Sequence, residues 1–327
     1  MTVESKTDFQ ARVALARCSG YQRAQMAVAM KALLDNLGGM SEFVKPGQRV
    51  LLKPNLIVPR SAEAAVTTHP EVVRAVARMV LEAGGKPFIG DSPAFSSAWA
   101  VAKACGIADV AEELGLEIVD LSRKARMRRV GADSPFQRVS FGSDALEADA
   151  IINLPKIKTH CQMGMSLGAK NMYGTVAGKR KCFFHFLNGE DPVRFGKLII
   201  AILRYTKPVL TIADGIVSLE RYGPTSGDPR ATGFLAASGD TIACDRVVME
   251  ILGVPQSAVY YMKAAQLMGY GCQDLHKIEV LGEKLEGLRI FDYVKVQKYS
   301  PINFTLPRVI KSTMKQALLL MRSRFRG

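Results

Sequence analysis

The chain has 327 residues, of which 48% are hydrophobic and 23% charged, a composition that excludes an intrinsically disordered protein. Its formal net charge of +14 predicts that anions are attracted to its surface, whether nucleic acid, lipid headgroups or acidic metabolites. The N-terminal sequence MTVESKTDFQ is polar, and no apolar run approaches the roughly 20 residues that span a bilayer. We therefore expect a cytoplasmic protein with neither a signal peptide nor a membrane span.

Short apolar runs rich in Val, Ile and Leu alternate along the chain with segments of helical periodicity. This alternation predicts an α/β fold with a mostly parallel sheet and helices on both faces. One helix begins at Pro70, where Thr68 or His69 can act as the N-cap, and Gly84 and Gly85 end it. The predicted strands are residues 13–16, 49–52, 87–89, 117–119, 150–153, 209–213 and 234–237, and the predicted helices are 22–37, 70–83 and 98–114.

Two segments depart from this alternation. The Arg-rich stretch 124–141 predicts a hairpin inserted in the α/β pattern, and the chain ends in a basic segment. We expect residues 1–253 to form the α/β domain that holds the ligand cleft, either undivided or divided into two lobes near 120–150. A packing extension is expected at 254–306, with a helix at 257–267 and a strand at 277–281, and a basic amphipathic helix or tail at 307–327.

The basic tail contains Lys and Arg residues and no acid. Ile310, Met314, Leu318 and Met321 fall roughly on one face of a helix, a pattern typical of a helix that lies at a membrane surface. The alternative is a solvated terminal helix or a disordered tail.

The six cysteines lie far apart, with no C-x-x-C pair, so no zinc ribbon or ferredoxin-type cluster can be built from local ligands. Isolated thiols are typical of a reducing cytoplasm, and we expect most of these cysteines to be buried. They are Cys18, Cys105, Cys161, Cys182, Cys244 and Cys272.

Polar residues gather just after the predicted strand ends, where an open α/β sheet places its ligands. In LLKPNL, Pro54 forces Lys53 into an extended conformation, so Lys53 and Asn55 are expected to point into a loop. In IGDSP, Asp91 and Ser92 follow a buried strand. Asp91 could bind a metal, a ribose hydroxyl or a substrate amine, or form an Asx turn.

The sequence VTTHP precedes a predicted helix and carries three polar side chains. Exposed amides at a helix N-terminus favour an anion, and Thr67, Thr68 and His69 could add hydrogen-bond donors. Simple N-capping is the alternative of equal weight.

The densest cluster spans residues 153–174, where three lysines stand beside a histidine among several glycines. Glycines let the backbone approach a ligand, and the lysines favour phosphate or carboxylate. A basic surface loop is the alternative, but MGMSLGA is too apolar for a freely solvated loop. We predict His160, Lys158 and Asp91 as catalytic residues. The substrate-binding candidates of this cluster are Asn153, Lys156, Lys170, Asn171 and Tyr173, and Lys181 and His185 extend the positive field downstream.

A further cluster follows the predicted strand at 209–213. Asp214 follows this strand as Asp91 follows its own, so Asp214 joins the substrate-binding candidates. Asp240 is expected to cap a helix that begins near Thr241.

The order of these motifs resembles the domain of unknown function 362 family. The matching elements are KPNL, TTHP, GDSP, LPKIKTH, GAKNMYG, ADG, GP and SGDTIACD, between about Val50 and Gly253. Many family members carry an appended ferredoxin domain and are labelled iron–sulfur proteins, but this chain has no C-x2-C-x2-C-x3-C run, so the resemblance implies no cluster here. A more distant resemblance in fold is to the nickel-pincer lactate racemase group, whose catalytic motifs have no match in this sequence.

The leading hypothesis is an enzyme that acts on a small carboxylate- or phosphate-bearing metabolite by proton or hydride transfer, in biosynthesis and with an external redox cofactor or redox partner protein. A second hypothesis is a metal-dependent enzyme. A third is a non-catalytic anion- or nucleic-acid-binding protein; nucleic acid is disfavoured because no zinc finger, RNA-recognition or helix-turn-helix signature is present. The candidate metal ligands are His69, Asp91, His160, His185 and Asp214.

Overall fold

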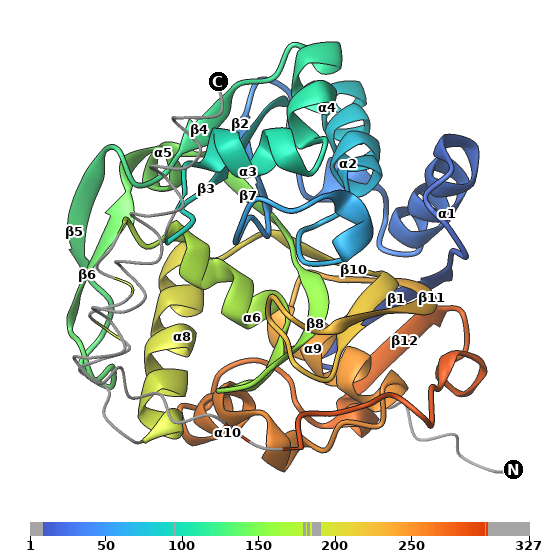
Figure 1. Cartoon of the computed structure of the whole chain (residues 1–327), viewed down its shortest axis with the longest axis vertical. Coiled ribbons are helices and arrows are strands. Elements are labelled where there is room, and N and C mark those ends of the chain that lie inside the picture. Colours follow the sequence, from blue (N-terminus) through green and yellow to red (C-terminus); the bar gives the residue numbers. More distant parts are fainter. Residues whose placement is uncertain are drawn as a thin grey trace, which may run out of the picture.

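A computed structural model describes residues 9–94, 96–178, 181, 184, 191–297 and 299. Across this part of the chain, ten strands form one twisted mixed sheet (Figure 1). The order of its main path is β12 (Ile278–Gly282), β1 (Ala11–Arg17), β11 (Asp228–Ser238), β10 (Leu210–Glu220), β7 (Ala150–Leu154), β2 (Arg49–Pro54), β3 (Lys86–Asp91) and β4 (Ile118–Asp120), while β8 (Lys156–His160) pairs with β10 and β9 (Gly164–Ser166) pairs with β8.

Most neighbouring strands of the sheet are parallel, as predicted. The exceptions are β11, which is antiparallel to both β1 and β10, and β9, which is antiparallel to β8. The predicted strand at 234–237 is the second half of β11, and the strand predicted at 277–281 is β12, which pairs with β1 at the edge of the sheet.

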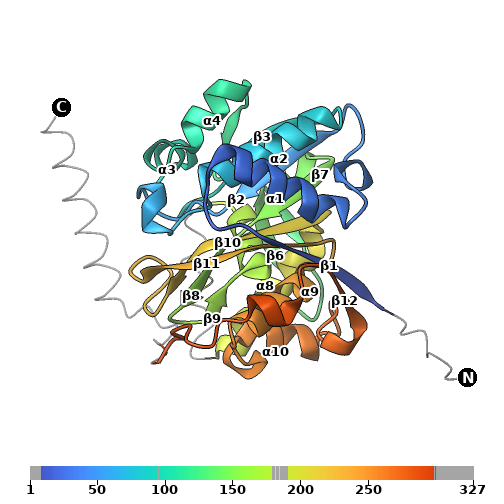
Figure 2. The ribbon, with the colours of Figure 1, turned by 90° about the vertical axis from the view of Figure 1, so that its right-hand side faces the viewer.

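Helices cover both faces of the sheet, as Figure 2 shows with α1 and α2 on one side and α8, α9 and α10 on the other. The α-helices are α1 (Arg23–Asp35), α2 (Pro70–Glu82), α3 (Ala98–Ala104), α4 (Ile107–Leu114), α5 (Ser143–Glu147), α6 (Gly168–Asn171), α8 (Pro192–Thr206), α9 (Thr241–Ile251) and α10 (Tyr260–Leu267). The short 3-10 helices are η1 (Met40–Glu42), η2 (Ala62–Ala64), η3 (Met172–Thr175), η4 (Gln256–Ala258), η5 (Leu275–Lys277) and η6 (Leu285–Leu288).

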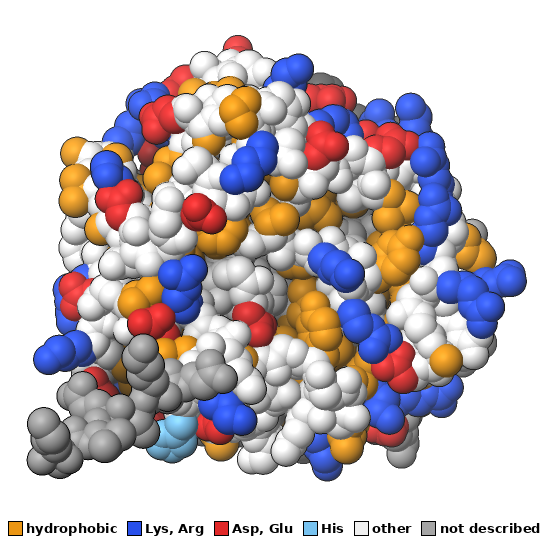
Figure 3. Space-filling model, turned by 180° about the vertical axis from the view of Figure 1, so that it is seen from behind, with side chains coloured by type: hydrophobic (Ala, Val, Ile, Leu, Met, Phe, Trp, Pro, Cys, Tyr) orange, Lys and Arg blue, Asp and Glu red, His pale blue; other side chains and the backbone are white. Residues whose placement is uncertain are grey.

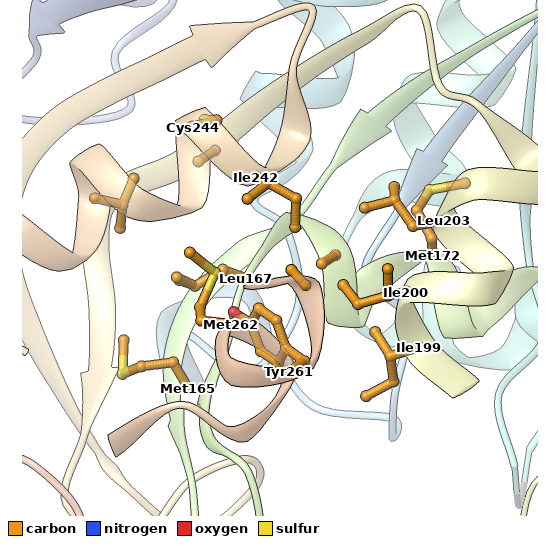
Figure 4. Packing of buried hydrophobic residues seen from close by; sticks show 14 of the residues in the cluster. Met165, Leu167, Met172, Ile199, Ile200, Leu203, Ile242, Cys244, Tyr261 and Met262 are labelled. Atoms are coloured by element: carbon orange, nitrogen blue, oxygen red, sulfur yellow. The ribbon is translucent and has the colours of Figure 1, made fainter. Parts of the chain in front are cut away.

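Six strands send alternate side chains into two separate hydrophobic cores, because successive side chains point to opposite faces of a sheet; they are β1, β2, β3, β7, β10 and β11. In β2, Leu51 packs in the core beneath α8, α9 and α10, whereas Val50 and Leu52 pack in the core beneath α1 to α4. Figure 4 shows the first core, with Tyr261 and Met262 of α10 beside Ile199 and Ile200 of α8. Burial on both faces explains why the strands read as continuous apolar runs.

The helix predicted at 98–114 is wrong as a single element, because the chain breaks it into α3 and α4. Gly106 adopts φ = 80° between them, a left-handed conformation that glycine accepts without steric cost. The Arg-rich hairpin is confirmed: β5 (Ala125–Arg129) and β6 (Arg138–Gly142) form a separate two-stranded antiparallel sheet.

The path of β7 and β8 creates the opening in which the candidate site lies. Leu52 of β2 pairs with Ile152 of β7, and β2 ends at Pro54. Beyond Pro155 the chain continues as β8, which pairs with β10 and no longer with β2. The strands therefore separate at their carboxyl ends, which is the edge where open α/β sheets bind ligands.

The described part of the chain contains no helix that is both long enough and apolar enough to cross a membrane. The basic tail at 307–327 lies outside the described residues. On the face seen in Figure 3, Lys and Arg side chains are interspersed with Asp and Glu and with apolar patches, so this face carries no continuous basic surface.

Candidate functional site

A cavity of about 220 Å³ lies at the carboxyl ends of β2 and β3, beside β8. Drug-sized ligands occupy about 300–1,000 Å³, and a water molecule takes about 30 Å³, so this cavity has room for a small metabolite. Eight predicted site residues are among its described lining residues: Lys53, Asn55, Asp91, Ser92, His160, Lys170, Asn171 and Tyr173.

A fully buried ion pair forms the floor of this cavity. Lys53 Nζ lies 3.0 Å from Asp91 Oδ1, with the two side chains 0% and 3% exposed. Asp91 also accepts hydrogen bonds from the amides of Leu56 (2.7 Å) and Ser92 (2.8 Å). Burial lowers the pKa of Lys53, and the Asp91 carboxylate opposes this shift. Loss of either partner would therefore leave the other as an uncompensated buried charge.

Gly174 closes over this ion pair from η3. A Cβ atom at this position would collide with Asp91 Oδ1 and with Nζ and Cε of Lys53. Glycine is therefore required here for the close approach of the backbone to the buried charges.

Replacing Gly174 with Ala is expected to destabilise the protein by about 1–3 kcal/mol, because the ion pair must move to admit the methyl group. Chemical denaturation measures the change in the free energy of unfolding. Gly47→Ala would not be a suitable control, because Gly47 has φ = +83° and an alanine there would be strained for a different reason. Gly239→Ala is the better control, since the nearest atom there lies 3.6 Å from the added Cβ and no left-handed φ is present. Equal stability of the two variants would contradict the assignment.

Three asparagine side chains connect the lysines in a hydrogen-bond chain of fixed direction. Lys158 Nζ donates to Asn55 Oδ1 (2.6 Å), Asn55 Nδ2 donates to Asn171 Oδ1 (3.0 Å), and Asn171 Nδ2 donates to Asn153 Oδ1 (2.9 Å). This series of hydrogen bonds ends at the carbonyl oxygen of Gly168, to which Asn153 Nδ2 donates. A lysine ammonium can only donate and a carbonyl can only accept, so the two ends set the orientation of every amide between them.

The cavity and its surroundings hold more lysines than carboxylates. Burial and repulsion from Lys53 lower the pKa of Lys170 to about 8. Burial lowers the pKa of Lys181 to about 7, with Asp91 opposing and Lys53 and Lys170 adding to the shift. Lys158 lies behind Asn55, fully buried; burial, followed by repulsion from Lys170 and Lys156, holds its pKa well below 10.5.

The ring of His160 is almost fully buried and lines the cavity. Its Nδ1 accepts a hydrogen bond from the amide of Gln162 at 3.1 Å. This contact requires an unprotonated Nδ1, so the neutral ring carries its proton on Nε2 and can donate from that atom.

Several predicted residues have local structural partners. Tyr173 hydroxyl donates to the carbonyl of Lys181 (2.9 Å), and Thr68 hydroxyl donates to the carbonyl of Leu154 (2.6 Å). Of the two N-cap candidates, it is His69 that caps α2, through Nδ1. Thr67 is fully buried, and its hydroxyl has no hydrogen-bond partner in the described part of the chain.

A second polar centre, outside the described lining of the cavity, gathers Lys156, Asp214 and His69. Lys156 Nζ lies 2.9 Å from Asp214 Oδ2, and the hydroxyl of Tyr21 bridges the pair, donating to Asp214 Oδ1 at 2.7 Å and accepting from Lys156. The amide of His69 also donates to Asp214, and the ring of His69 stacks on Tyr21 at 3.5 Å. Burial lowers the pKa of His69 to about 4, which keeps its cap nitrogen unprotonated.

The predicted metal ligands are divided between these two places. Asp91 and His160 line the cavity, whereas His69 and Asp214 belong to the second centre, and His185 lies outside the described residues. Among the described residues, no three His, Cys, Asp or Glu side chains converge as a metal site would require.

Asp245 anchors the chain at the start of α6, where its carboxylate accepts hydrogen bonds from the amides of Gly168 (2.7 Å) and Ala169 (3.0 Å). Burial raises the pKa of this carboxyl from 3.8 to about 7, against the effect of the two amides. The folded protein therefore favours the protonated acid, and this contribution to stability is lost as the pH rises from about 4 through about 7.

Asp245→Asn is expected to remove this pH dependence. Relative to the unmodified protein, the variant should be more stable at about pH 8 than at about pH 5, measured as the difference in free energy of unfolding. Asp35→Asn, on the exposed surface of α1, serves as the control. A difference that stays constant between the two pH values would contradict the assignment.

Some cavity residues were not predicted. Ser166, Gln162 and Pro224 line it, and the lysine at 181, predicted only as part of the surrounding positive field, lines it as well. Ser166 lies in the unpredicted strand β9, so no strand-end pattern marks it, whereas Pro224 belongs to the GP motif of the family resemblance but is not among the predicted site residues.

The match to known proteins covers the same region as the site. The family described as domain of unknown function (DUF362) matches residues 50–250, the span that contains both polar centres except Tyr21. The chain belongs to this family. This confirms the resemblance of the motifs from KPNL to SGDTIACD.

One relative of the chain is a thylakoid-associated protein of Synechocystis sp., which is 41% identical over 304 residues, 93% of each chain. Among solved structures, the lactate racemase apoprotein of Thermoanaerobacterium thermosaccharolyticum aligns with 75% of this chain at 13% identity and a TM-score of 0.45. The chain covers 59% of that protein's length.

Proposed function

We propose that this chain is an enzyme that binds a small carboxylate- or phosphate-bearing metabolite and catalyses a proton transfer on it. The observation that supports the proposal is the imbalance of charge in the cavity. Lys53, Lys170 and Lys181 line it together with one carboxylate, Asp91, among the described lining residues. Asp91 is already paired with Lys53, so an anion bound beside Lys170 and Lys181 would supply the missing negative charge.

In this proposal the cavity residues divide the chemical work. Lys170 and Lys181 bind the anionic group, and because their pKa values before binding are about 8 and about 7, one of the two amines can be neutral near neutral pH and accept a proton. His160 donates its Nε2 proton in a hydrogen bond to a substrate oxygen, which stabilises negative charge that develops on this oxygen. Because its Nδ1 is occupied as an acceptor, His160 fits this role better than that of a general base.

Hydrogen–deuterium exchange tests the activity directly. Small carboxylates and phosphates are incubated with the protein in D₂O, and loss of their C–H signals is followed by NMR. At least one anion is expected to exchange, at a rate that falls by about 10²–10³ in His160→Ala. The exposed Lys31→Met serves as the control. If no anion exchanges, or if His160→Ala and Lys170→Met both leave exchange unchanged, the proposal is wrong.

The other hypotheses rest on weaker support. Hydride transfer would need an external redox cofactor or partner protein, whereas proton transfer rests on groups already present in the cavity. Of the predicted metal ligands that the structure describes, Asp91 and His160 line the cavity, and Asp91 is held by Lys53 and two backbone amides. Metal analysis of the purified protein separates these alternatives.

For the location, we propose that the protein works in the cytoplasm and contacts a membrane surface. Two facts support this: a relative with 41% identity is named thylakoid-associated, and residues 307–327 contain six Lys or Arg residues and no acid. Cosedimentation with vesicles of anionic lipid tests it. Deletion of Pro307 to Gly327 is expected to weaken binding, and unchanged binding by the truncated chain would exclude the tail as the contact.

A further inference from the structure

Lys170 differs from the other lysines near the cavity in its hydrogen bonding. Lys53 donates to the carbonyl oxygen of Pro54, Lys158 to that of Val66, and Lys181 to that of Ser92. Within the described residues, Nζ of Lys170 has no hydrogen-bond acceptor, although it lines the cavity. Among the described lysines that line the cavity, Lys170 is therefore the one whose amine is not held by a described acceptor.

The surroundings of this amine are aromatic and cationic. Nζ of Lys170 lies 4.9 Å from the ring centre of Tyr173 and 5.9 Å from that of Phe195. Lys53 is close enough to repel it electrostatically. A lysine that is desolvated by apolar walls and placed next to another cation has a larger neutral fraction, and the neutral amine is the form that attacks a carbonyl.

We propose that Lys170 is a nucleophile that forms a covalent imine with a small 2-oxo acid. The inference rests on the proposed function, whose substrate class it narrows. Lys170 and Lys181 both line this cavity, so a ligand bound in it can place its carboxylate at Lys181 and the adjacent carbonyl at Lys170. A 2-oxo acid has these two groups on neighbouring carbons, and the cavity of about 220 Å³ admits a molecule of this size.

The chemical step is balanced without an added oxidant or reductant. The lone pair of Nζ attacks the carbonyl carbon, and the C=O π electrons move to the oxygen, which takes up a proton. In the resulting carbinolamine a proton passes from the nitrogen to the hydroxyl group, which leaves as water while the nitrogen lone pair forms the C=N bond. One amine, one carbonyl compound and one proton give one iminium ion and one water. His160, which lines the same cavity, polarises the carbonyl by hydrogen bonding from Nε2.

Reductive trapping tests the imine. The full-length protein is incubated with pyruvate, reduced with borohydride and digested for mass spectrometry. One reduced adduct is expected, on the peptide that contains Lys170. Lactate, which has no carbonyl, should give no adduct, and acetone, which has no carboxylate, should give much less than pyruvate.

Lys170→Arg keeps the positive charge but cannot form the imine, so the adduct should be lost while the protein remains folded by circular dichroism. An adduct spread over surface lysines, or equal labelling of Lys170→Arg, would overturn the inference. Phosphate binding distinguishes its failure from that of the proposed function. If phosphate binds in a manner that depends on Lys181 but pyruvate gives no adduct, only the imine is wrong; if neither ligand binds, both proposals are wrong.

Discussion

Replacing Asp91 with Asn is expected to lower the free energy of unfolding by about 3–5 kcal/mol, the largest effect on stability that we predict. The substitution leaves the fully buried ammonium of Lys53 without its counter-charge. The carboxylate of Asp91 accepts hydrogen bonds from the backbone amides of Leu56 and Ser92. In the Asn variant the side-chain NH₂ group would face one of these two amides, so two donors would meet there. Urea denaturation, followed by circular dichroism, measures the change.

The double variant Lys53→Met/Asp91→Asn separates charge from packing. Because it removes the unpaired buried charge, it should be more stable than Asp91→Asn alone. Asp35→Asn, which breaks a pair that is exposed on both sides, should cost about 0–1 kcal/mol. A double variant less stable than Asp91→Asn would show that the ion pair is not the reason for the loss.

Lys170→Met and Lys181→Met are expected to weaken the binding of inorganic phosphate by about 10–100-fold each, the largest effect on ligand affinity that we predict. Hydrogen bonds to charged groups contribute about 1.5–3 kcal/mol, and about 1.4 kcal/mol corresponds to a tenfold change in affinity. Isothermal titration calorimetry measures the dissociation constant. The control is Lys103→Met, an exposed lysine that faces Trp99 on α3 and lies outside the described lining of the cavity.

If the two cavity variants bind phosphate as well as the control does, the anion does not occupy this cavity. If only one of them weakens binding, the anion contacts that lysine alone, and the proposed pairing of Lys170 with Lys181 is wrong.

Much of the candidate site follows from sequence because strand ends meet at one edge of a parallel sheet. Lys53 and Asp91 are 38 positions apart, yet each ends an apolar strand, and β2 and β3 are adjacent and parallel. Their side chains therefore meet as an ion pair. His160 and Lys170 could be placed near them for a similar reason, since the cluster that contains them follows β7, the other neighbour of β2.

Other features had no local signal. Tyr21 precedes α1 and is 193 positions from Asp214, so its place between Lys156 and Asp214 depends on the tertiary fold alone. Pro155 argues against a continuing strand, yet its position lets β8 leave β2 and follow β10. As a result, Lys156 and Asp214 form a centre outside the described cavity lining, although the sequence suggested a common cleft with Asp91.

The sequence predicts the layers of the fold but not the direction of every strand. The alternation of apolar runs correctly predicts a mostly parallel sheet covered on both faces, because both hydrophobic cores draw on the same strands. The antiparallel insertion of β11 could not be read from its sequence, since a strand buried on both faces carries no mark of its direction.

Proton uptake on anion binding tests most directly whether Lys170 and Lys181 of this cavity hold a small anion. Lys170 and Lys181 have pKa values of about 8 and about 7, so at about pH 8 a large part of these amines is neutral. A bound anion stabilises the ammonium forms, so binding should draw protons from solution and should weaken as the pH rises above about 7. Calorimetric titration of phosphate at about pH 8, in buffers of different ionisation enthalpy, measures this uptake. We expect a net uptake of protons that is reduced in Lys170→Met and in Lys181→Met. Binding without proton uptake, or uptake unchanged in both variants, would show that these two lysines do not hold the anion.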